Sequence, residues 1–287
     1  MQRERIWLAL LLVSVLTQLP ALQVHGADSL INSEELLMHH LDSIGSGQAR
    51  SSAKTRVVQG TAVYRIVVGG GGRLEGKTGL VSEGRKLRYM VKFAQTDYRG
   101  ENVAFNGDRI SVSFSTSNQS RSAFAAFIAA QDVILRDGLL GGTLSTAWPL
   151  LDLEGRKAKL ILEGLKKVDG RQLYQVRYEP AKRADAQITL YFEPDTFRHV
   201  KTVYATSIGN NVGGDITQSS KLQAERTTLE ERFNDFKTVE GLTLPSHWNL
   251  QFTWELPSGT TSVTEWDLKE DQITNNMGLD PKNFEVK

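Results

Sequence analysis

The chain has 287 residues, enough for one large domain or two smaller ones, and it contains no cysteine. The lack of thiols excludes disulfides, metal thiolates and a lipid-anchored cysteine. Lysine and arginine total 34 against 33 aspartates and glutamates, a formal net charge of +1. This balance argues against a nucleic-acid-binding protein, which needs a basic patch.

The N-terminal residues have the pattern of an export signal. Arg3 and Arg5 precede an apolar run over residues 6–16, which is shorter than the roughly 20 residues needed to span a bilayer. Because the residues before position 27 suit a signal peptidase, we expect a signal peptide over residues 1–26, cut between Gly26 and Ala27. The mature chain, residues 27–287, is then periplasmic or secreted and has no stable membrane span.

A capped helix is predicted next, over residues 32–45. Asn32 or Ser33 can cap its start, and Glu35 can complete a capping box. Residues 45–53 are small and polar, and we interpret them as a linker. From Lys54 the apolar residues alternate with polar ones, which predicts strands over residues 54–116 with one buried and one solvated face.

One segment within these strands, residues 71–78, matches the P-loop pattern letter for letter. A P-loop needs a helix directly after its Lys-Thr pair, because the amides of the first helical turn cradle the phosphates. Gly79 and Gly84 follow instead, and the sequence then alternates as a strand. We therefore predict a hairpin here and no nucleotide.

A helical insert is predicted over residues 120–153. Ser120 or Ser122 can cap a helix in which apolar residues recur at helical spacing, Asp132 and Arg136 can pair, and Gly138 ends the helix. The residues that follow are unusually apolar for a loop. Two interpretations stay open: the insert is ordinary core, or it is a plug over the concave face of a sheet where an apolar guest could sit.

The alternation resumes after the insert and predicts strands over residues 156–268, followed by a C-terminal tail over 269–287. Together the two strand regions give about ten to twelve antiparallel strands, because nothing in the order of elements suggests a parallel sheet. The fold class is therefore mainly β (α+β).

No catalytic or metal-binding signature stands out. His39, His40, His199 and His247 lack the spacing of metal ligands. The neighbouring acids Glu230 and Glu231 would point to opposite faces of a strand, so they give no acid–base pair. We expect neither an enzyme nor a cofactor or metal.

Three stretches resemble a known family: residues 190–200 (LYFEPDTFRHV), residues 233–245 (FNDFKTVEGLTLP) and residues 276–284. They are similar to the LolA/LolB-like exported lipoprotein carriers, which sort outer-membrane lipoproteins, and to their RseB-like relatives. The resemblance implies one domain over residues 27–287, a curved antiparallel half-barrel with helices in its concave face and an apolar cavity for acyl chains. The chain departs from LolB in having no lipid-anchored cysteine, and residues 138–151 match no carrier residue by residue.

The predicted function is that of an exported, non-enzymatic binding protein that holds a lipid, an acyl chain or a lipoprotein in an apolar concave cavity. The alternatives are a periplasmic sensor or scaffold that binds an envelope protein through its sheet edge, and a hydrolase with an unrecognised site. The residues expected to line the cavity are Phe93, Val103, Phe105, Phe114, Phe124, Phe127, Ile128, Leu139, Leu140, Leu144 and Trp148.

Overall fold

The computed structural model describes residues 31–113, 121–208 and 225–286. The predicted signal peptide, its cleavage site and Phe114 lie outside these residues. Among the helices of the described part, none combines the length and apolar character needed to cross a bilayer.

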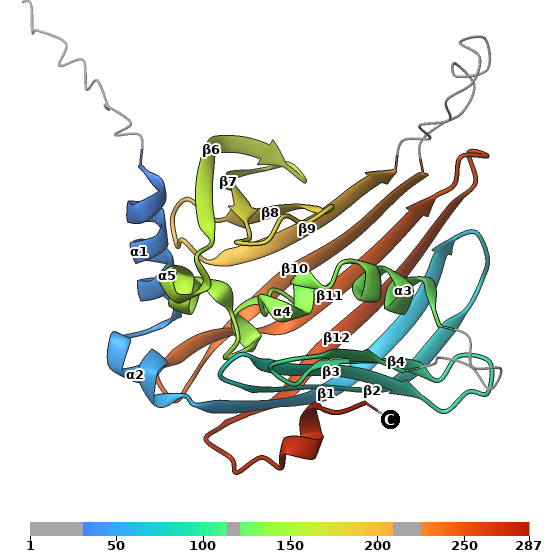
Figure 1. Cartoon of the computed structure of the whole chain (residues 1–287), viewed down its shortest axis with the longest axis horizontal. Coiled ribbons are helices and arrows are strands. Elements are labelled where there is room, and N and C mark those ends of the chain that lie inside the picture. Colours follow the sequence, from blue (N-terminus) through green and yellow to red (C-terminus); the bar gives the residue numbers. More distant parts are fainter. Residues whose placement is uncertain (1–30, 114–120, 209–224, 287) are drawn as a thin grey trace, which may run out of the picture. The chain divides into compact units, whose positions relative to one another are not determined.

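The described residues form one antiparallel sheet of twelve strands (Figure 1). Its first meander comprises β1 Thr55–Val68, β2 Arg73–Glu83, β3 Lys86–Phe93, β4 Gly100–Phe105 and β5 Ile110–Val112. The second comprises β6 Lys159–Val168, β7 Arg171–Glu179, β8 Gln187–Phe192, β9 His199–Ile208, β10 Glu225–Val239, β11 Leu242–Glu255 and β12 Thr261–Asn275. Within the described residues, β1 pairs with β12 while β5 and β6 remain edges. The predicted fold, a curved and unclosed antiparallel sheet, is confirmed.

The insert between β5 and β6 lies on the concave side of the sheet, where Figure 1 shows α3 and α4 in front of β10–β12. Its helices are α3 Ala123–Ala130, α4 Val133–Arg136 and α5 Leu153–Arg156, with 3-10 turns η1 Gly142–Leu144 and η2 Pro149–Asp152 between them. Side chains from the insert and from the inner face of the sheet form one hydrophobic core.

The start of the insert helix is confirmed, but its predicted course to Gly138 is wrong. The Ser122 hydroxyl accepts from the Ala125 N–H at 2.9 Å and caps α3. The helix ends at Ala130 because Gln131 leaves the helical conformation, with ψ at 59°. The Gln131 Oε1 atom accepts from the Ala186 N–H at 3.2 Å, so the β7–β8 connection holds this break.

The N-terminal helix α1, Ser33–Ile44, has the predicted capping box between Asn32 and Glu35. The linker predicted after it is wrong in its centre, where Gly47–Ser52 form a short helix, α2. Ser46 caps this helix, and the Arg50 guanidinium donates to the carbonyls of Leu41 and Gly45, which ties α2 to the end of α1. Local polar contacts therefore order a segment that the composition suggested was a linker.

The P-loop-like segment is a hairpin, as predicted. Lys77 and Thr78 lie within β2, which pairs with β1 along its length, and no helix follows them. On the other side of β1, its neighbour β12 extends to Asn275, so residues 269–275 are strand and not tail. The polar and charged side chains of this segment break the alternation that predicts a strand. Pairing with β1 nevertheless satisfies the hydrogen-bonding groups of its backbone.

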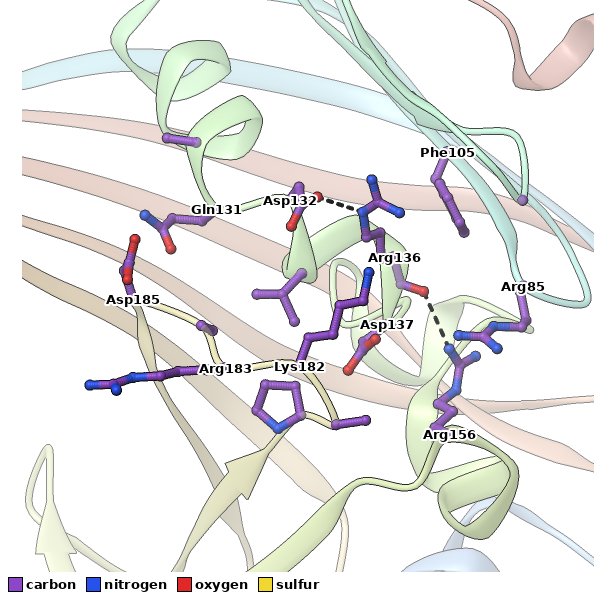
Figure 2. A pocket seen from close by; sticks show the side chains of 16 residues that line it. Arg85, Phe105, Gln131, Asp132, Arg136, Asp137, Arg156, Lys182, Arg183 and Asp185 are labelled. Atoms are coloured by element: carbon purple, nitrogen blue, oxygen red, sulfur yellow. Dashed lines mark hydrogen bonds and ion pairs between the residues drawn. The ribbon is translucent and has the colours of Figure 1, made fainter.

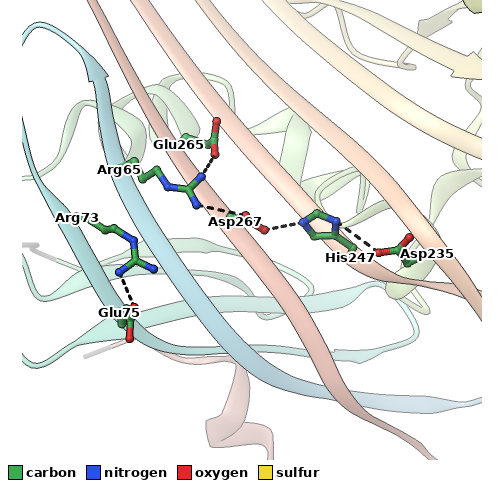
Figure 3. Close-up of polar contacts among 7 residues, drawn as sticks. All are labelled: Arg65, Arg73, Glu75, Asp235, His247, Glu265 and Asp267. Atoms are coloured by element: carbon green, nitrogen blue, oxygen red, sulfur yellow. Dashed lines mark hydrogen bonds and ion pairs between the residues drawn. The ribbon is translucent and has the colours of Figure 1, made fainter.

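The outer face of the sheet is polar, as the alternation predicted. Figure 3 shows Arg65 of β1 close to Glu265 and Asp267 of β12, and His247 of β11 close to Asp267. The residues between these positions, such as Trp266 and Leu268, are buried on the inner face. The strands therefore present their apolar side chains to the insert.

Candidate functional site

The predicted cavity residues lie together, but as packed core. Phe93 comes from β3, Val103 and Phe105 from β4, and the rest from the insert: Phe124, Phe127, Ile128, Leu139, Leu140, Leu144 and Trp148. Each of these side chains is at most 7% exposed and belongs to the same core cluster. The insert therefore makes, in this structure, the contacts that the sequence analysis assigned to a ligand. Their role in binding stays a prediction.

Residues 139–148 of the insert are anchored by polar contacts from the surrounding sheet. The three main ones are Gly141 N–H to Glu231 Oε2 at 2.8 Å, Arg56 NH1 to the Thr143 carbonyl at 2.8 Å, and Thr146 N–H to Ser82 Oγ at 2.9 Å. Buried polar groups lose more when unpaired than they gain when paired. This half of the insert is therefore fixed in place.

Trp148 and two histidines add to the contacts that anchor residues 139–148. The indole N–H of Trp148 donates to His40 Nε2 at 3.0 Å, and the Nδ1 of His40 lies 3.0 Å from the Phe197 carbonyl, to which it donates. The ring of His199 stacks on Trp148 with centroids 4.6 Å apart. Burial lowers the pKa of His40 to about 4 and also lowers the pKa of His199, so both rings are neutral packing partners.

Glu231 is the acidic member of the anchor. Its carboxyl accepts from the Tyr204 hydroxyl at 2.6 Å as well as from the Gly141 N–H. Burial raises its pKa to about 7. Its neighbour Glu230 points to the outer face, where it pairs with Lys201 at 3.0 Å. The two acids face opposite ways, as predicted, and form no acid–base pair.

Helix α3 is held differently from residues 139–148. At its start, the Ser122 hydroxyl donates to Glu101 at 2.8 Å, and burial raises the pKa of that carboxyl to about 7. The rest of the helix packs through apolar side chains, with Phe124 5.2 Å from Trp266 and Phe127 near Phe252. A helix this short has little stability of its own. Polar contacts at its two ends, through Ser122 and Gln131, and apolar packing between them therefore keep α3 on the sheet.

A cavity of about 520 Å³ opens beside the end of α3 and around α4 (Figure 2). Its walls come from the β2–β3 turn at Arg85, from Phe105 and Gly107, from residues 130–137, from Arg156 and from residues 180–185. Five cationic and three acidic side chains line it, an excess of two positive charges: Arg85, Arg136, Arg156, Lys182 and Arg183, with Asp132, Asp137 and Asp185.

The sequence analysis found only two parts of this cavity. Phe105 was expected at an apolar site, and the i,i+4 pair between Asp132 and Arg136 is present at 2.5 Å. The remaining charged residues were missed because they come from segments far apart in the sequence. In the described part of the chain, no group of three or more His, Cys, Asp or Glu could hold a metal ion.

No family model and no curated protein matches this chain. Solved structures are similar over most of its length. A LolA superfamily protein, NE2245 of Nitrosomonas europaea, is 16% identical, with 89% of this chain and 98% of that chain covered and a TM-score of 0.45. A DUF1329 family protein of Desulfovibrio piger is 12% identical, with 88% and 96% covered and a TM-score of 0.44.

The MucA/MucB complex of Pseudomonas aeruginosa gives a third similar chain, 11% identical, with 85% of this chain and 100% of that chain covered and a TM-score of 0.23. A LolA superfamily protein is thus among the structures to which this chain is similar, in agreement with the resemblance found in the sequence. At these identities the similarity concerns the fold.

Proposed function

We propose that the chain is an exported, non-enzymatic binding protein that holds the apolar chain of a lipid or lipoprotein between α3 and the sheet. One observation carries this proposal: α3, with the sequence AFAAFIAA, is wholly apolar and lies on the inner face of an unclosed sheet. Phe124, Phe127 and Ile128 occupy the place that an acyl chain would take.

The free energy gained by burying an acyl chain is of the same order as the free energy lost when the side chains of α3 leave the sheet. Burying a Phe or Ile side chain contributes about 1.5–3 kcal/mol, so the three side chains of α3 contribute about 5–9 kcal/mol. A dozen methylenes at about 0.8 kcal/mol each contribute about 10 kcal/mol before ordering costs. An acyl chain could therefore replace the packing of α3 without a large net cost.

The anchored residues have a separate role in this proposal. Leu139, Leu140, Leu144 and Trp148 would form a fixed wall, because the polar contacts of residues 139–148 hold that half of the insert. The buried His40 and Glu231 are occupied by these contacts, which supports a binding role over a catalytic one.

The natural lack of cysteine allows a direct test, since each single-cysteine variant carries one thiol. Ala125→Cys places it in α3 and Ser145→Cys in the anchored half; the native side chains are 1% and 0% exposed. We expect a fluorescent fatty acid to bind the exported protein and to speed thiol labelling of Ala125→Cys but not of Ser145→Cys. No uptake by the wild type, or equal labelling of both variants, would overturn the proposal.

The edge of the sheet favours a second candidate, a protein partner that adds a strand to β6. No described strand pairs with the outer edge of β6, and Leu165 on it is 49% exposed. On this edge the Leu162 N–H already donates to Ser33 Oγ of α1 at 3.1 Å, and an added strand would satisfy the remaining backbone groups. Leu165→Pro would then abolish the complex with the partner and leave fatty-acid uptake unchanged.

A further inference from the structure

Arg156, at the wall of the charged cavity, forms no ion pair with any carboxylate of the described residues. Its side chain is buried, with 7% of the residue exposed. It donates to the carbonyls of Ala147 at 2.6 Å and Arg136 at 3.5 Å, and its Nε has no hydrogen-bond partner. A buried charge that is left uncompensated is costly, so the position calls for an explanation.

A second guanidinium, that of Arg85, faces the same space. Figure 2 shows the Arg85 and Arg156 side chains close together at one end of the cavity. Burial, and then the charge of Arg85, lowers the pKa of Arg156. Arg85 forms no ion pair with any described residue, while Asp137 and Asp152 offset part of the charge of Arg156 without forming an ion pair with it.

The acidic groups near the cavity offset the charge of this pair only in part. Asp132 is taken by Arg136 at 2.5 Å, and Asp137 accepts from the Tyr178 hydroxyl at 2.8 Å. The β7–β8 connection adds Lys182, which lines the cavity and forms no ion pair with any carboxylate of the described residues. Arg85, Arg156 and Lys182 outnumber Asp137 and Asp152, so this end of the cavity keeps an excess of positive charge.

Apolar side chains continue the wall away from the arginines. Phe105, Ala130 and Val133 line the cavity, and Ala130 is the last residue of α3. A ligand with an anionic end at the arginines would therefore point its remaining atoms toward α3. The cavity combines a cationic end with an apolar wall, as an amphiphile requires.

We propose that the cavity binds the oxyanion of an amphiphile, a carboxylate or phosphate group, between Arg85 and Arg156, with Lys182 from the facing loop. The planar guanidinium presents donors in a fork that fits both groups. This inference rests on the proposed function for the position of the apolar chain, but the oxyanion site stands on its own contacts.

The test replaces Arg85 with an acid. Arg85→Glu would place a carboxylate beside Arg156, so we expect an unchanged or raised melting temperature together with loss of oxyanion binding. Arg85→Gln should weaken dodecanoate binding about tenfold, the equivalent of one charge-assisted hydrogen bond. Arg73→Gln is the matched control, because Arg73 is an exposed arginine on the β1–β2 hairpin that pairs with Glu75.

Three amphiphiles and one chainless anion separate the possible results: dodecanoate, dodecyl phosphate and the neutral dodecanol, and inorganic phosphate. We expect both anionic amphiphiles to bind the wild type more tightly than dodecanol does. On Arg85→Glu we expect all three amphiphiles to bind with the same affinity. Equal binding of all three to the wild type would overturn the oxyanion site and leave the proposed function standing. Binding of inorganic phosphate alone, lost in Arg85→Glu, would support the site and contradict the acyl-binding function.

Discussion

Trp148 is the residue at which the insert, α1 and β9 meet. It is fully buried, donates to His40 and stacks on His199. We expect Trp148→Ala to lower the free energy of unfolding by about 3–5 kcal/mol, because it opens a cavity and leaves His40 Nε2 without a donor. Denaturant unfolding measures this cost. A loss below about 1 kcal/mol would show that residues 139–148 yield, contrary to their polar anchoring.

Glu231 gives the chain a pH dependence that can be isolated. Its pKa is about 7 in the folded protein, above the ordinary value of 4.5, because burial disfavours its charge. The folded state therefore holds a proton that the unfolded state loses between pH 4.5 and 7. The stability associated with that proton is complete below pH 4.5 and is lost as the pH rises through 7.

Glu231→Gln replaces this carboxyl with an amide that does not titrate. We expect the free energy of unfolding of the wild type, relative to that of the variant, to fall by about 1.4 kcal/mol per pH unit between pH 4.5 and 7. Denaturant unfolding of both proteins at several pH values measures this difference in the free energy of unfolding. His40 is present in both proteins, so its opposing pH dependence cancels in the difference. Leu229→Val, a buried change without a titratable group, should shift the whole curve in parallel. A parallel shift for Glu231→Gln would contradict the prediction.

At the scale of elements, Gly138 fixes how the insert turns after α4. Its φ is +68°, and an added Cβ would lie 2.1 Å from the Ala147 carbonyl oxygen. Gly138→Ala should therefore cost about 2–3 kcal/mol, because neither backbone can move away freely. Gly164 in β6 is the control, with φ at +89° and open space around the Cβ position. Equal costs in denaturant unfolding would show that the close approach has no effect.

The β1–β2 hairpin gives a prediction about the P-loop-like sequence. Lys77 is exposed on β2, with no helix beside it. Lys77→Ala should change the free energy of unfolding by no more than about 0.5 kcal/mol, as for other surface substitutions. Calorimetric titration with ATP tests the same interpretation, since an affinity that disappears in the variant would restore the P-loop assignment.

The sequence predicted those elements whose causes are local. The capping box of α1 and the cap at Ser122 each involve residues within one turn, and the alternation in β3 records one buried and one wet face. The break at Gln131 was missed because its partner, Ala186, lies in another part of the chain. The end of β12 was missed because β1, and not an apolar pattern, stabilises it.

At the scale of the molecule, the twelve-stranded sheet followed from counting strands, whereas the charged cavity did not follow from anything in the sequence. Arg85 lies in a turn, Arg156 at the end of a short helix and Lys182 in a loop. Only the curvature of the sheet brings these segments together. The described apolar residues of the predicted site lie together because a core collects them, but their packing against one another depends on shape, and their role in binding stays a prediction.

The pairing of β1 with β12 also determines when the folding of the sheet can be completed. Arg56 and Asn275, whose side chains are hydrogen-bonded across these strands, are 219 residues apart, while every other strand pairing among the described residues joins strands that follow one another in the chain. Each meander can therefore assemble early from local hairpins, but their union must wait until β12 has been made. A chain threaded N-terminus first through a narrow channel would leave β1 with one edge unoccupied throughout the passage. In such a passage the sheet could be completed only once β12 had emerged.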